Sequence, residues 1–518
     1  MKSVILGVSC ALQAQVRAET IKLQQILERR PVLIVLVLMA VYAAYFSYYT
    51  ILKHYAFQSY AFDLGIFMQY MWSTVQGEAV LYASILESSC FAWHFQPVLF
   101  LIVPLYGLFP HAETLLVLQS VVLALGALPV YWLARDELGA RVGVVFAGLY
   151  LLYPALHGVN SFDFHPVALA IPILLFCFYA FKTKRYGWGM ALAVLAMMCK
   201  ENVSLVIVFM GLYWWLWVEM RKGLARLELR SLPKQREVLY PLCMSVVGAI
   251  WLLLAINVVI PHFSLSGEYP WFHRYGTTGI LGNLPADAIH KLWYLDYLFA
   301  PLLFVPLLSP PTLLIGLPVF AQNLLAVDAN MYSIGFQYSS LLIPWLFLAS
   351  IYGAKYLSTV QGKVVDAIRN RLLQILVVST IVMTLLVSPS PVALGREMPS
   401  MTQHHTILRT AIELIPEDAS VYTQNDVFPH VCHRMHAYAH IIVRPPDFFE
   451  FYDGKYDYVL ADSTLAQSIL KWGSQASLER LEREYGVYAE GDGVYLYKRG
   501  YEGEPLKLGV AAEHKCAE

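Results

Sequence analysis

Charged residues are scarce in this sequence. Only 14% of its 518 residues are Asp, Glu, Lys or Arg, whereas 58% are hydrophobic. A soluble globular chain typically carries about a quarter of charged residues, and so few charges cannot cover a water-exposed surface of this size. The scarcity therefore argues against a soluble protein and favours a polytopic α-helical membrane protein.

Two further signals are missing. The seven cysteines are scattered and include no CxxC pair, so neither a disulfide framework nor a zinc site is indicated. The formal net charge of −1 provides no basic surface for nucleic acid, so we expect no nucleic-acid partner. The sequence contains no pattern that indicates a particular cofactor. Whether a divalent cation is required stays open.

Apolar segments follow one another along most of the chain. They lie near residues 31–50, 96–109, 113–134, 142–157, 166–181, 186–199, 203–219, 238–260, 293–308, 311–326, 338–354 and 372–388. Before the first of them, residues 1–30 contain Lys2, a short apolar core and several arginines. We interpret residues 1–30 as a cytoplasmic N-terminal tail, with a cleaved signal peptide as the alternative.

Basic residues mark every second connection between these segments. The basic clusters are Arg29/Arg30, Arg135/Arg141, 182–185, 221–236 and 353–371. Cytoplasmic loops of membrane proteins carry an excess of Lys and Arg, so these five are placed in the cytoplasm. The outer side then receives the connections 158–165, 200–202, 261–292 and 327–337 and the chain after about residue 390. This predicts a multi-pass protein of the plasma membrane with a cytoplasmic N-terminus.

The segment 96–109 breaks this alternation. It has about 14 residues where a span needs about 20, and it contains Pro97 and Pro104. We predict an interfacial or re-entrant helix here, inside a large outer loop over 51–112. The transmembrane part, residues 31–390, then has about eleven transmembrane helices plus interfacial helices in that loop.

The composition changes after about residue 390. Residues 456–462 and 493–499 alternate as strands do, and 463–486 resemble an amphipathic helix. We predict a small extracytoplasmic α/β domain over 391–500 and a disordered tail over 501–518.

Six histidines lie between residues 404 and 440. The spacing H-x2-H-x2-H-x3-H of the last four, His430 to His440, would let them line one side of a helix, which is compatible with a metal site. No Cys or Asp pattern accompanies them, so a solvated polar face is the preferred interpretation.

One carboxylate stands out in the first outer loop. In the stretch SYAFDLGIFMQYMW, residues 59–72, Asp63 lies among apolar and aromatic residues. Asp is a favoured helix N-cap, because its carboxylate accepts the free N–H groups of the first turn. Two interpretations therefore stay open: Asp63 caps an interfacial helix that ends at Gly77, or it takes part in catalysis.

Other polar groups fall on the same predicted side of the membrane. They are His94, Asp163, His165, Lys200, Glu201, Gln337 and Tyr338. Each of them also has a purely structural interpretation. His94, Asp163 and His165 could be capping or interfacial residues, Lys200 and Glu201 could form an ion pair, and Gln337 and Tyr338 could belong to an interfacial belt. Ionisable groups at membrane depth are costly unless paired or hydrated, which makes them candidates for a functional site. We predict that the loops carrying them converge on one cavity.

The chain resembles a prokaryotic membrane-protein family, domain of unknown function 2079, over about residues 35–500. The resemblance rests on the motifs FDLGIF, HFQPVLFLIVPLYGLFP, TLLVLQSVVLALGALPVYWLAR, FDFHPVALAIP, KENVSL and FQYSSLLIPWLF. The order of features also resembles the GT-C superfamily of membrane glycosyltransferases: a first helix, a large outer loop with an early Asp, a re-entrant segment, packed helices and a soluble outer domain.

The GT-C resemblance implies a membrane enzyme that transfers a sugar from a polyprenyl-phosphate-linked donor to a glycan, lipid or protein acceptor. It implies that Asp63, by its position, is the general base for the acceptor hydroxyl, and that Lys200 with His165 or His94 holds the lipid phosphate. Many members have a second acid directly after the loop Asp, whereas Leu64 follows here. The remaining polar groups are candidate substrate contacts. A transporter or lipid flippase, and a non-catalytic scaffold, are the alternatives.

Overall fold

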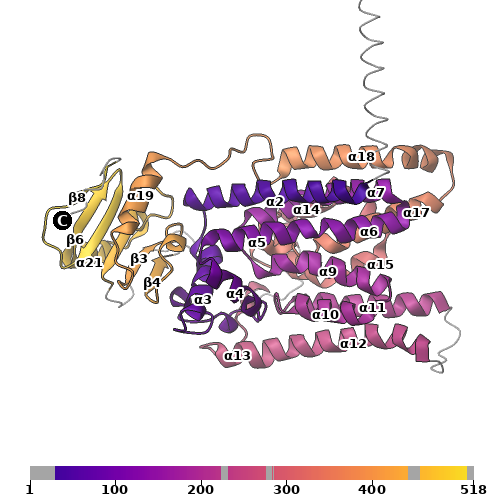
Figure 1. Cartoon of the computed structure of the whole chain (residues 1–518), viewed down its shortest axis with the longest axis horizontal. Coiled ribbons are helices and arrows are strands. Elements are labelled where there is room, and N and C mark those ends of the chain that lie inside the picture. Colours follow the sequence, from indigo (N-terminus) through magenta and orange to yellow (C-terminus); the bar gives the residue numbers. More distant parts are fainter. Residues whose placement is uncertain (1–29, 223–231, 276–282, 284, 441–455, 510–518) are drawn as a thin grey trace, which may run out of the picture.

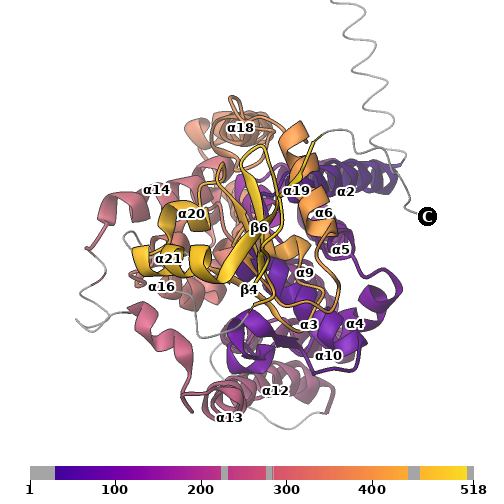
Figure 2. The same ribbon diagram turned by 90° about the vertical axis from the view of Figure 1, so that its left-hand side faces the viewer.

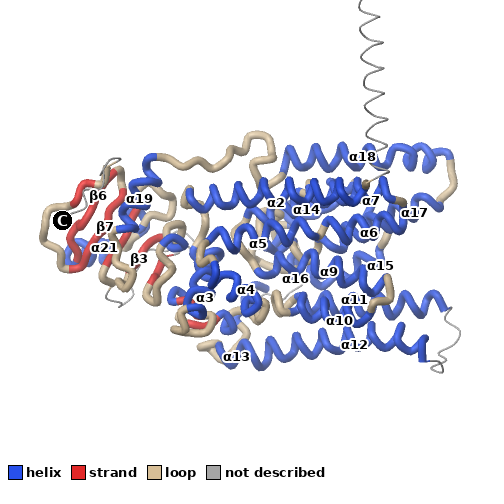
Figure 3. The backbone as a smooth tube through the Cα atoms, viewed as in Figure 1, coloured by secondary structure: helices blue, strands red, loops and turns tan. Residues whose placement is uncertain are grey.

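The computed structural model describes the chain apart from residues 1–29, 223–231, 276–282, 284, 441–455 and 510–518. The predicted N-terminal tail and the end of the predicted C-terminal tail therefore lie outside the described residues. Two parts lie end to end along the longest axis: a large bundle of helices and a smaller domain built on a β-sheet (Figure 1). The strands gather in the smaller domain, apart from two short strands near α3 (Figure 3).

The bundle consists of helices that run mostly along this axis. They are α2 (Pro31–Tyr55), α5 (Ala112–Leu125), α6 (Ala127–Leu138), α7 (Ala140–Leu151), α8 (Pro154–Ser161), α9 (Pro166–Lys182), α10 (Tyr186–Met197), α11 (Val203–Lys222), α12 (Leu232–Leu254), η4 (Ala255–Val259), α13 (Ile260–Phe263), α14 (Ala288–Phe299), α17 (Ile343–Thr359) and α18 (Lys363–Val387). α2, α8 and α9 begin at prolines, which suit a first helical turn because the N–H that proline lacks would have no helical partner there.

Four helical stretches among the described residues are long and apolar enough to cross a bilayer: Pro31–Tyr55, Ala112–Leu138, Arg236–Phe263 and Arg369–Val387. The pair Ala140–Leu151 and Pro154–Ser161 forms a fifth candidate, bent by 43° at the break before Pro154. The structure is thus that of a polytopic helical membrane protein, and the total of eleven crossings stays a prediction.

Two predicted membrane segments, 293–308 and 311–326, are broken. After α14 the chain forms η7 (Ala300–Leu302), η8 (Val305–Leu308), α15 (Pro310–Leu313), η9 (Leu314–Gly316) and α16 (Leu317–Leu324), and η10 (Ala329–Tyr332) and η11 (Gln337–Ser339) follow. Four of the first five pieces carry a proline at one of their first two positions. A proline obstructs the turn that precedes it, so each new proline ends the helix before it. The expectation of two continuous helices is wrong.

The first outer loop contains short elements only. They are η1 (Ala61–Gly65), α3 (Ile66–Val75), β1 (Tyr82–Ala83), η2 (Ser84–Leu86), β2 (Ser88–Ser89), η3 (Cys90–Ala92) and α4 (Leu99–Leu108). The ten residues of α4 span about 15 Å, half of the roughly 30 Å of a hydrocarbon core. This agrees with the prediction that 96–109 is not a full crossing. α3 and α4 lie at the end of the bundle that faces the sheet domain (Figure 1).

The opposite end of the bundle gathers the basic connections. Lys182 Nζ lies 2.7 Å from Glu137 Oε1, and Lys355 pairs with the same carboxylate. Lys184 pairs with Glu237. Three of the connections that the Lys and Arg pattern assigns to one side therefore meet at Glu137, and the pair of Lys184 and Glu237 joins one of them to α12.

The sheet domain has six strands in the order β4-β3-β5-β7-β6-β8. They are β3 (Val421–Gln424), β4 (Ala437–His440), β5 (Tyr458–Asp462), β6 (Tyr485–Gly491), β7 (Val494–Arg499) and β8 (Leu506–Lys507), accompanied by α19 (Gln403–Glu413), η12 (Phe428–His430), α20 (Ile469–Trp472) and α21 (Gln475–Glu484). β3 is parallel to β4 and β5, whereas β7 is antiparallel to β5 and β6. Seen from this end, the sheet domain lies in front of the helical bundle (Figure 2).

The strands expected at 456–462 and 493–499 correspond to β5 and β7. The single helix expected over 463–486 is wrong: α20 and α21 are separate, because the chain leaves the helix at Gly473 and Ser474 caps the next one. Residues 501–509, expected to be disordered, include β8, whose backbone pairs with β6.

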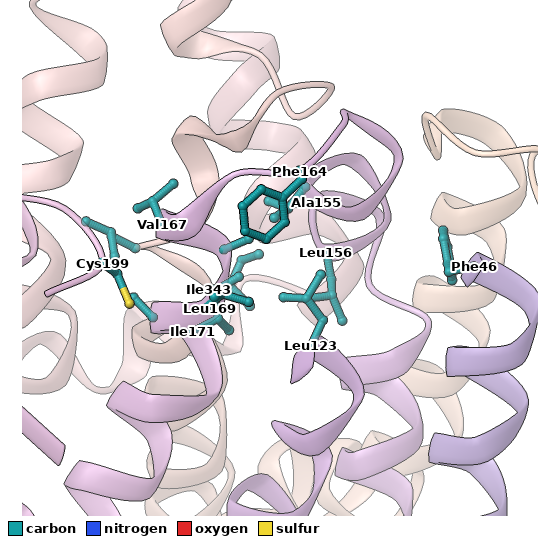
Figure 4. Close-up of a cluster of buried hydrophobic side chains, with 14 of the residues drawn as sticks. Phe46, Leu123, Ala155, Leu156, Phe164, Val167, Leu169, Ile171, Cys199 and Ile343 are labelled. Atoms are coloured by element: carbon teal, nitrogen blue, oxygen red, sulfur yellow. The ribbon is translucent and has the colours of Figure 1, made fainter. Parts of the chain in front are cut away.

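The buried apolar core lies next to the loop 162–165. Phe164 and residues of α9 pack with α5, α8 and α17; the labelled side chains are Phe46, Leu123, Ala155, Leu156, Phe164, Val167, Leu169, Ile171, Cys199 and Ile343 (Figure 4). Burial of each large apolar side chain contributes about 1.5–3 kcal/mol. This packing fixes two connections that carry predicted site residues, 162–165 and 199–202.

Candidate functional site

Asp63 lies in the middle of η1, a single π-helical turn. The N-cap of η1 is Tyr60, and neither it nor the N-cap of α3 makes a side-chain capping hydrogen bond. The interpretation of Asp63 as a helix cap is therefore wrong. Its carboxylate is turned to a different partner.

That partner is His165, whose Nε2 atom lies 3.0 Å from Asp63 Oδ1. The backbone N–H of His165 donates to Gln119 Oε1 of α5 at 2.9 Å, and this hydrogen bond fixes the position of the residue. Its ring stacks on Phe162, with ring centres 5.4 Å apart. The Nδ1 atom of His165 is buried without a hydrogen-bond partner. The contact thus joins an oriented imidazole to an oriented carboxylate.

Asp163 makes hydrogen bonds next to Asp63, but it is not among the described residues that line the two cavities of the site. Its Oδ1 accepts from Lys53 Nζ at 3.0 Å, and its Oδ2 accepts from the backbone N–H of Tyr60 at 2.8 Å. Asp163 does not cap α9, whose N-cap is His165. Asp163 was predicted to share a pocket with Asp63. Its role is indirect instead, because it holds Tyr60, the N-cap of η1.

Two adjoining cavities lie beside the Asp63–His165 pair. We name the first the Asp63 cavity, with a volume of about 280 Å³; its polar and aromatic lining residues include Asp63, Phe67, Tyr70, Trp93, His94, His165, Lys200, Trp271, Arg274, Gln337 and Tyr338. We name the second the Glu201 cavity, of about 190 Å³; its lining includes His94, Lys200, Glu201, Leu252, Ile256, Tyr269, Trp271, Arg274, Gln322, Asn323, Gln337 and Tyr338. The shared residues form the boundary between the two.

Glu201 organises the boundary. Its Oε1 accepts from His94 Nδ1 at 2.9 Å and from the hydroxyl of Tyr269 at 3.1 Å, and its Oε2 accepts from the N–H of Phe95. Burial raises the pKa of Glu201, but the pairing with His94 and the charge of Lys200 outweigh it and lower the pKa to about 2. Burial lowers the pKa of His94 to about 4, so the imidazole is neutral at pH 7.

The sequence analysis left open a direct ion pair between Lys200 and Glu201. The structure does not contain this pair among its described residues. In the part of the chain that the structure describes, the ammonium of Lys200 makes no ion pair, and it faces both cavities. Burial lowers the pKa of Lys200 to about 8, with Glu201 acting in the opposite direction. Lys200 is thus still mainly charged at pH 7 and available for an anion.

Arg274 is a second cation at the same boundary, and the sequence analysis did not select it. Its guanidinium lies 4.0 Å from the ring centre of Trp271, and His94 stacks on the same ring, with centres 4.8 Å apart. Trp271 Nε1 donates to the backbone O of Trp93 at 2.6 Å. The column of His94, Trp271 and Arg274 holds the guanidinium in a fixed place.

A signal for this column was present in the sequence. The outer connection 261–292 contains EYPWFHRYG, in which aromatic residues surround one arginine. An arginine on the side that Lys and Arg usually avoid is unusual. Gln337 and Tyr338, in η11, line both cavities from the connection after it.

The histidines between 404 and 440 do not lie on one helix. His404 and His405 begin α19, His430 ends η12 and His440 ends β4, so the expectation of a common helix is wrong. No group of three or more metal-ligating side chains is found among the described residues. The solvated-face interpretation is also wrong for His430, whose ring stacks on His54 of α2 with centres 4.1 Å apart.

Residues 53–496 match the family described as "Predicted membrane protein (DUF2079)". The chain belongs to the DUF2079 family. No curated protein matches its sequence.

The structure of this DUF2079 protein resembles ArnT from Cupriavidus metallidurans bound to undecaprenyl phosphate, with a TM-score of 0.52 at 13% identity over 89% of this chain and 97% of ArnT. The archaeal oligosaccharyltransferase AglB from Archaeoglobus fulgidus, in complex with an inhibitory peptide and a dolichol-phosphate, gives 0.44 at 12% identity over 91% of this chain and 75% of AglB. The likeness to ArnT concerns the fold.

Proposed function

We propose that this DUF2079 protein is a membrane glycosyltransferase of the GT-C type. It transfers a sugar from a polyprenyl-phosphate-linked donor to a glycan, lipid or protein acceptor on the extracytoplasmic side. The observation that supports this most directly is the meeting of an oriented carboxylate, Asp63, with two cations, Lys200 and Arg274, around one pair of cavities. The resemblance to a fold that holds undecaprenyl phosphate in ArnT agrees with it.

Asp63 is the general base. The acceptor hydroxyl donates its proton to the Asp63 carboxylate while its oxygen bonds to the anomeric carbon of the donor sugar. The bond from that carbon to the phosphate oxygen breaks, and the lipid phosphate leaves with the electron pair. A carboxylate placed within reach of the acceptor hydroxyl can accept this proton as a general base. His165 orients Asp63 through the 3.0 Å contact.

Lys200 and Arg274 receive the phosphate. Fixed cations stabilise the negative charge that develops on a leaving group, and they do so more strongly in a site that excludes water. The Glu201 cavity extends to Leu252 and Ile256, which belong to the stretch Arg236–Phe263 with the composition of a membrane span. These apolar residues support a route for the polyprenyl chain beside the proposed phosphate position. His94, Glu201, Gln337 and Tyr338 contact the donor or keep the cations in place.

The Lys and Arg residues in the connections support one orientation of the protein in the membrane. We propose that the end with the Glu137, Lys182 and Lys355 ion pairs is cytoplasmic, and that the sheet domain and the cavities are extracytoplasmic. In this arrangement residues 1–30 form a cytoplasmic tail, 31–390 the transmembrane domain and 391–500 the outer domain.

The test is an assay with purified protein in detergent or liposomes and a panel of polyprenyl-phosphate hexoses and pentoses. The wild type should release free polyprenyl phosphate when acceptor is present, and Asp63→Asn should reduce release by at least about 10²-fold with an unchanged melting temperature. Glu87→Gln, an exposed acid in the same loop, is the matched control and should retain activity. Wild-type rates in Asp63→Asn would contradict the assignment. Movement of lipid across the liposome without phosphate release would favour the flippase alternative.

A further inference from the structure

The crossover between β3 and β4, residues 425–436, contacts the turn that carries Asp63. The N–H of Ala61, the first residue of η1, donates to both the side-chain Oδ1 and the backbone O of Asn425, each at 2.9 Å. Asn425 is only 7% exposed. A hydrogen bond that is shielded from water is electrostatically stronger than an exposed one, so it holds the start of η1 firmly.

The last residue of η1, Gly65, packs against the same crossover. A Cβ atom at Gly65 would lie 2.6 Å from Phe428 Cδ1 and 3.5 Å from Pro429 Cγ. Phe428 is completely buried, so its ring cannot move without disturbing a close-packed surrounding. Both ends of η1 are thus held by the sheet domain, and Asp63 stands between them.

A second set of bonds fixes the helix that continues η1. Gln69 of α3 donates to the backbone O of Arg434 at 2.7 Å, and the hydroxyl of Ser84 donates to the backbone O of Ala437. Gln69 and Ser84 also bond to each other at 2.8 Å. Since α3 follows η1 without interruption, the turn and the helix are held together as one unit.

We infer that the β3–β4 crossover is a positioning element for Asp63. Asn425, with Phe428 packed on Gly65, directs the Asp63 carboxylate toward His165 and the Asp63 cavity. Asp163 accepts from the backbone N–H of Tyr60, the N-cap of η1. This inference rests on the proposed function and gives the sheet domain a role in it. Displacement of a reacting group by 1 Å can cost about 10²-fold in rate, so a fixed turn matters for a base.

The experiment combines kinetics with hydrogen–deuterium exchange on the full-length protein. Asn425→Ala removes one of the two acceptors of the Ala61 N–H. We expect faster exchange in the segment 58–66 and a kcat lowered at least about tenfold, since a displaced base loses rate. KM for the donor should change less than twofold, because Lys200 and Arg274 are not touched.

Two further variants separate positioning from general damage. Ser420→Ala is the matched control: it removes a hydrogen bond to Asp457 within the sheet domain, and it should leave exchange in 58–66 and kcat unchanged. Gly65→Ala should reproduce the loss of kcat, and adding Phe428→Leu should restore part of it by making room for the new methyl group.

Unchanged exchange over 58–66 in Asn425→Ala overturns the inference, whatever the activity. An equal loss of kcat in Ser420→Ala overturns it as well, because the loss would then reflect the stability of the domain. If Asn425→Ala raises the exchange but the wild type transfers no sugar from any donor tested, the positioning contact is supported and the proposed function is the part that fails.

Discussion

His165 Nε2 lies 3.0 Å from Asp63 Oδ1, although the two residues belong to different connections and are about a hundred residues apart in the chain. The contact depends on Gln119 of α5, which binds the N–H of His165, and on η1, which exposes the carboxylate. A carboxylate that is held by an imidazole has one preferred orientation. The contact with His165 therefore orients the Asp63 carboxylate beside the Asp63 cavity.

The imidazole of His165 should matter for rate more than for stability. His165→Phe keeps an aromatic ring beside Phe162 but removes the hydrogen bond to Asp63, and we expect kcat to fall by about 10²-fold. His165→Gln, which retains a donor, should lose less. The measurement is the initial rate of polyprenyl phosphate release together with the melting temperature. His111→Gln, at an exposed histidine, is the control, and equal rates for His165→Phe and wild type would remove His165 from the site.

Donor binding should weaken at high pH. Burial lowers the pKa of Lys200 to about 8, so the charged form that attracts phosphate is lost as the pH rises through this value. We expect kcat/KM for the donor, which reports the free enzyme, to fall between pH 7 and pH 9. Lys200→Arg keeps its charge and should show a flatter profile in this window. Identical profiles for the two proteins would show that Lys200 does not titrate in binding.

The pair of Lys53 and Asp163 should contribute strongly to stability. Their side chains are 12% and 2% exposed, and removing one partner of a buried pair costs about 3–5 kcal/mol because the other charge is left alone. Asp163→Asn should therefore lower the melting temperature clearly, and the double variant Lys53→Met/Asp163→Asn should recover part of it. Lys184→Met, which breaks an exposed pair with Glu237 at the other end of the bundle, should change little. Additive losses in the double variant would contradict this coupling.

The sheet domain should be stabilised by His404 at low pH only. Burial lowers the pKa of His404, but the hydrogen bonds to Asp462 and Asp492 outweigh it and raise the pKa above its usual value. The folded state therefore binds the proton more tightly than the unfolded state. The stabilisation is complete below the unfolded pKa of about 6.5 and disappears as the pH rises through the folded pKa.

The corresponding measurement compares the melting temperatures of wild type and His404→Gln at pH 6 and pH 9. The difference should be larger at pH 6. His436→Gln, at an exposed histidine of the same domain, should show no such dependence. A difference between wild type and His404→Gln that is the same at both pH values would mean that the imidazole is not charged in the folded protein.

Much of the site was accessible from the sequence, because polar residues that stand beside apolar segments on the predicted outer side are few. Asp63, His94, His165, Lys200, Glu201, Gln337 and Tyr338 were selected in this way, and they line the two cavities. Asp163 met the same criteria as Asp63 but pairs with Lys53. Arg274 was not selected, because nothing in the sequence shows that Trp271 orders it.

The sequence by itself determined that this is a helical membrane protein in which the segment 96–109 is too short to cross the bilayer and the composition changes after about residue 390. Bilayer thickness and hydropathy act on consecutive residues, so they can be read along the chain. Only the tertiary structure decided which acid meets which base, where two continuous helices break into pieces, and that the sheet domain reaches back to the turn of Asp63. These outcomes depend on packing between segments far apart in the chain, and a pattern of neighbouring residues carries no information about such contacts.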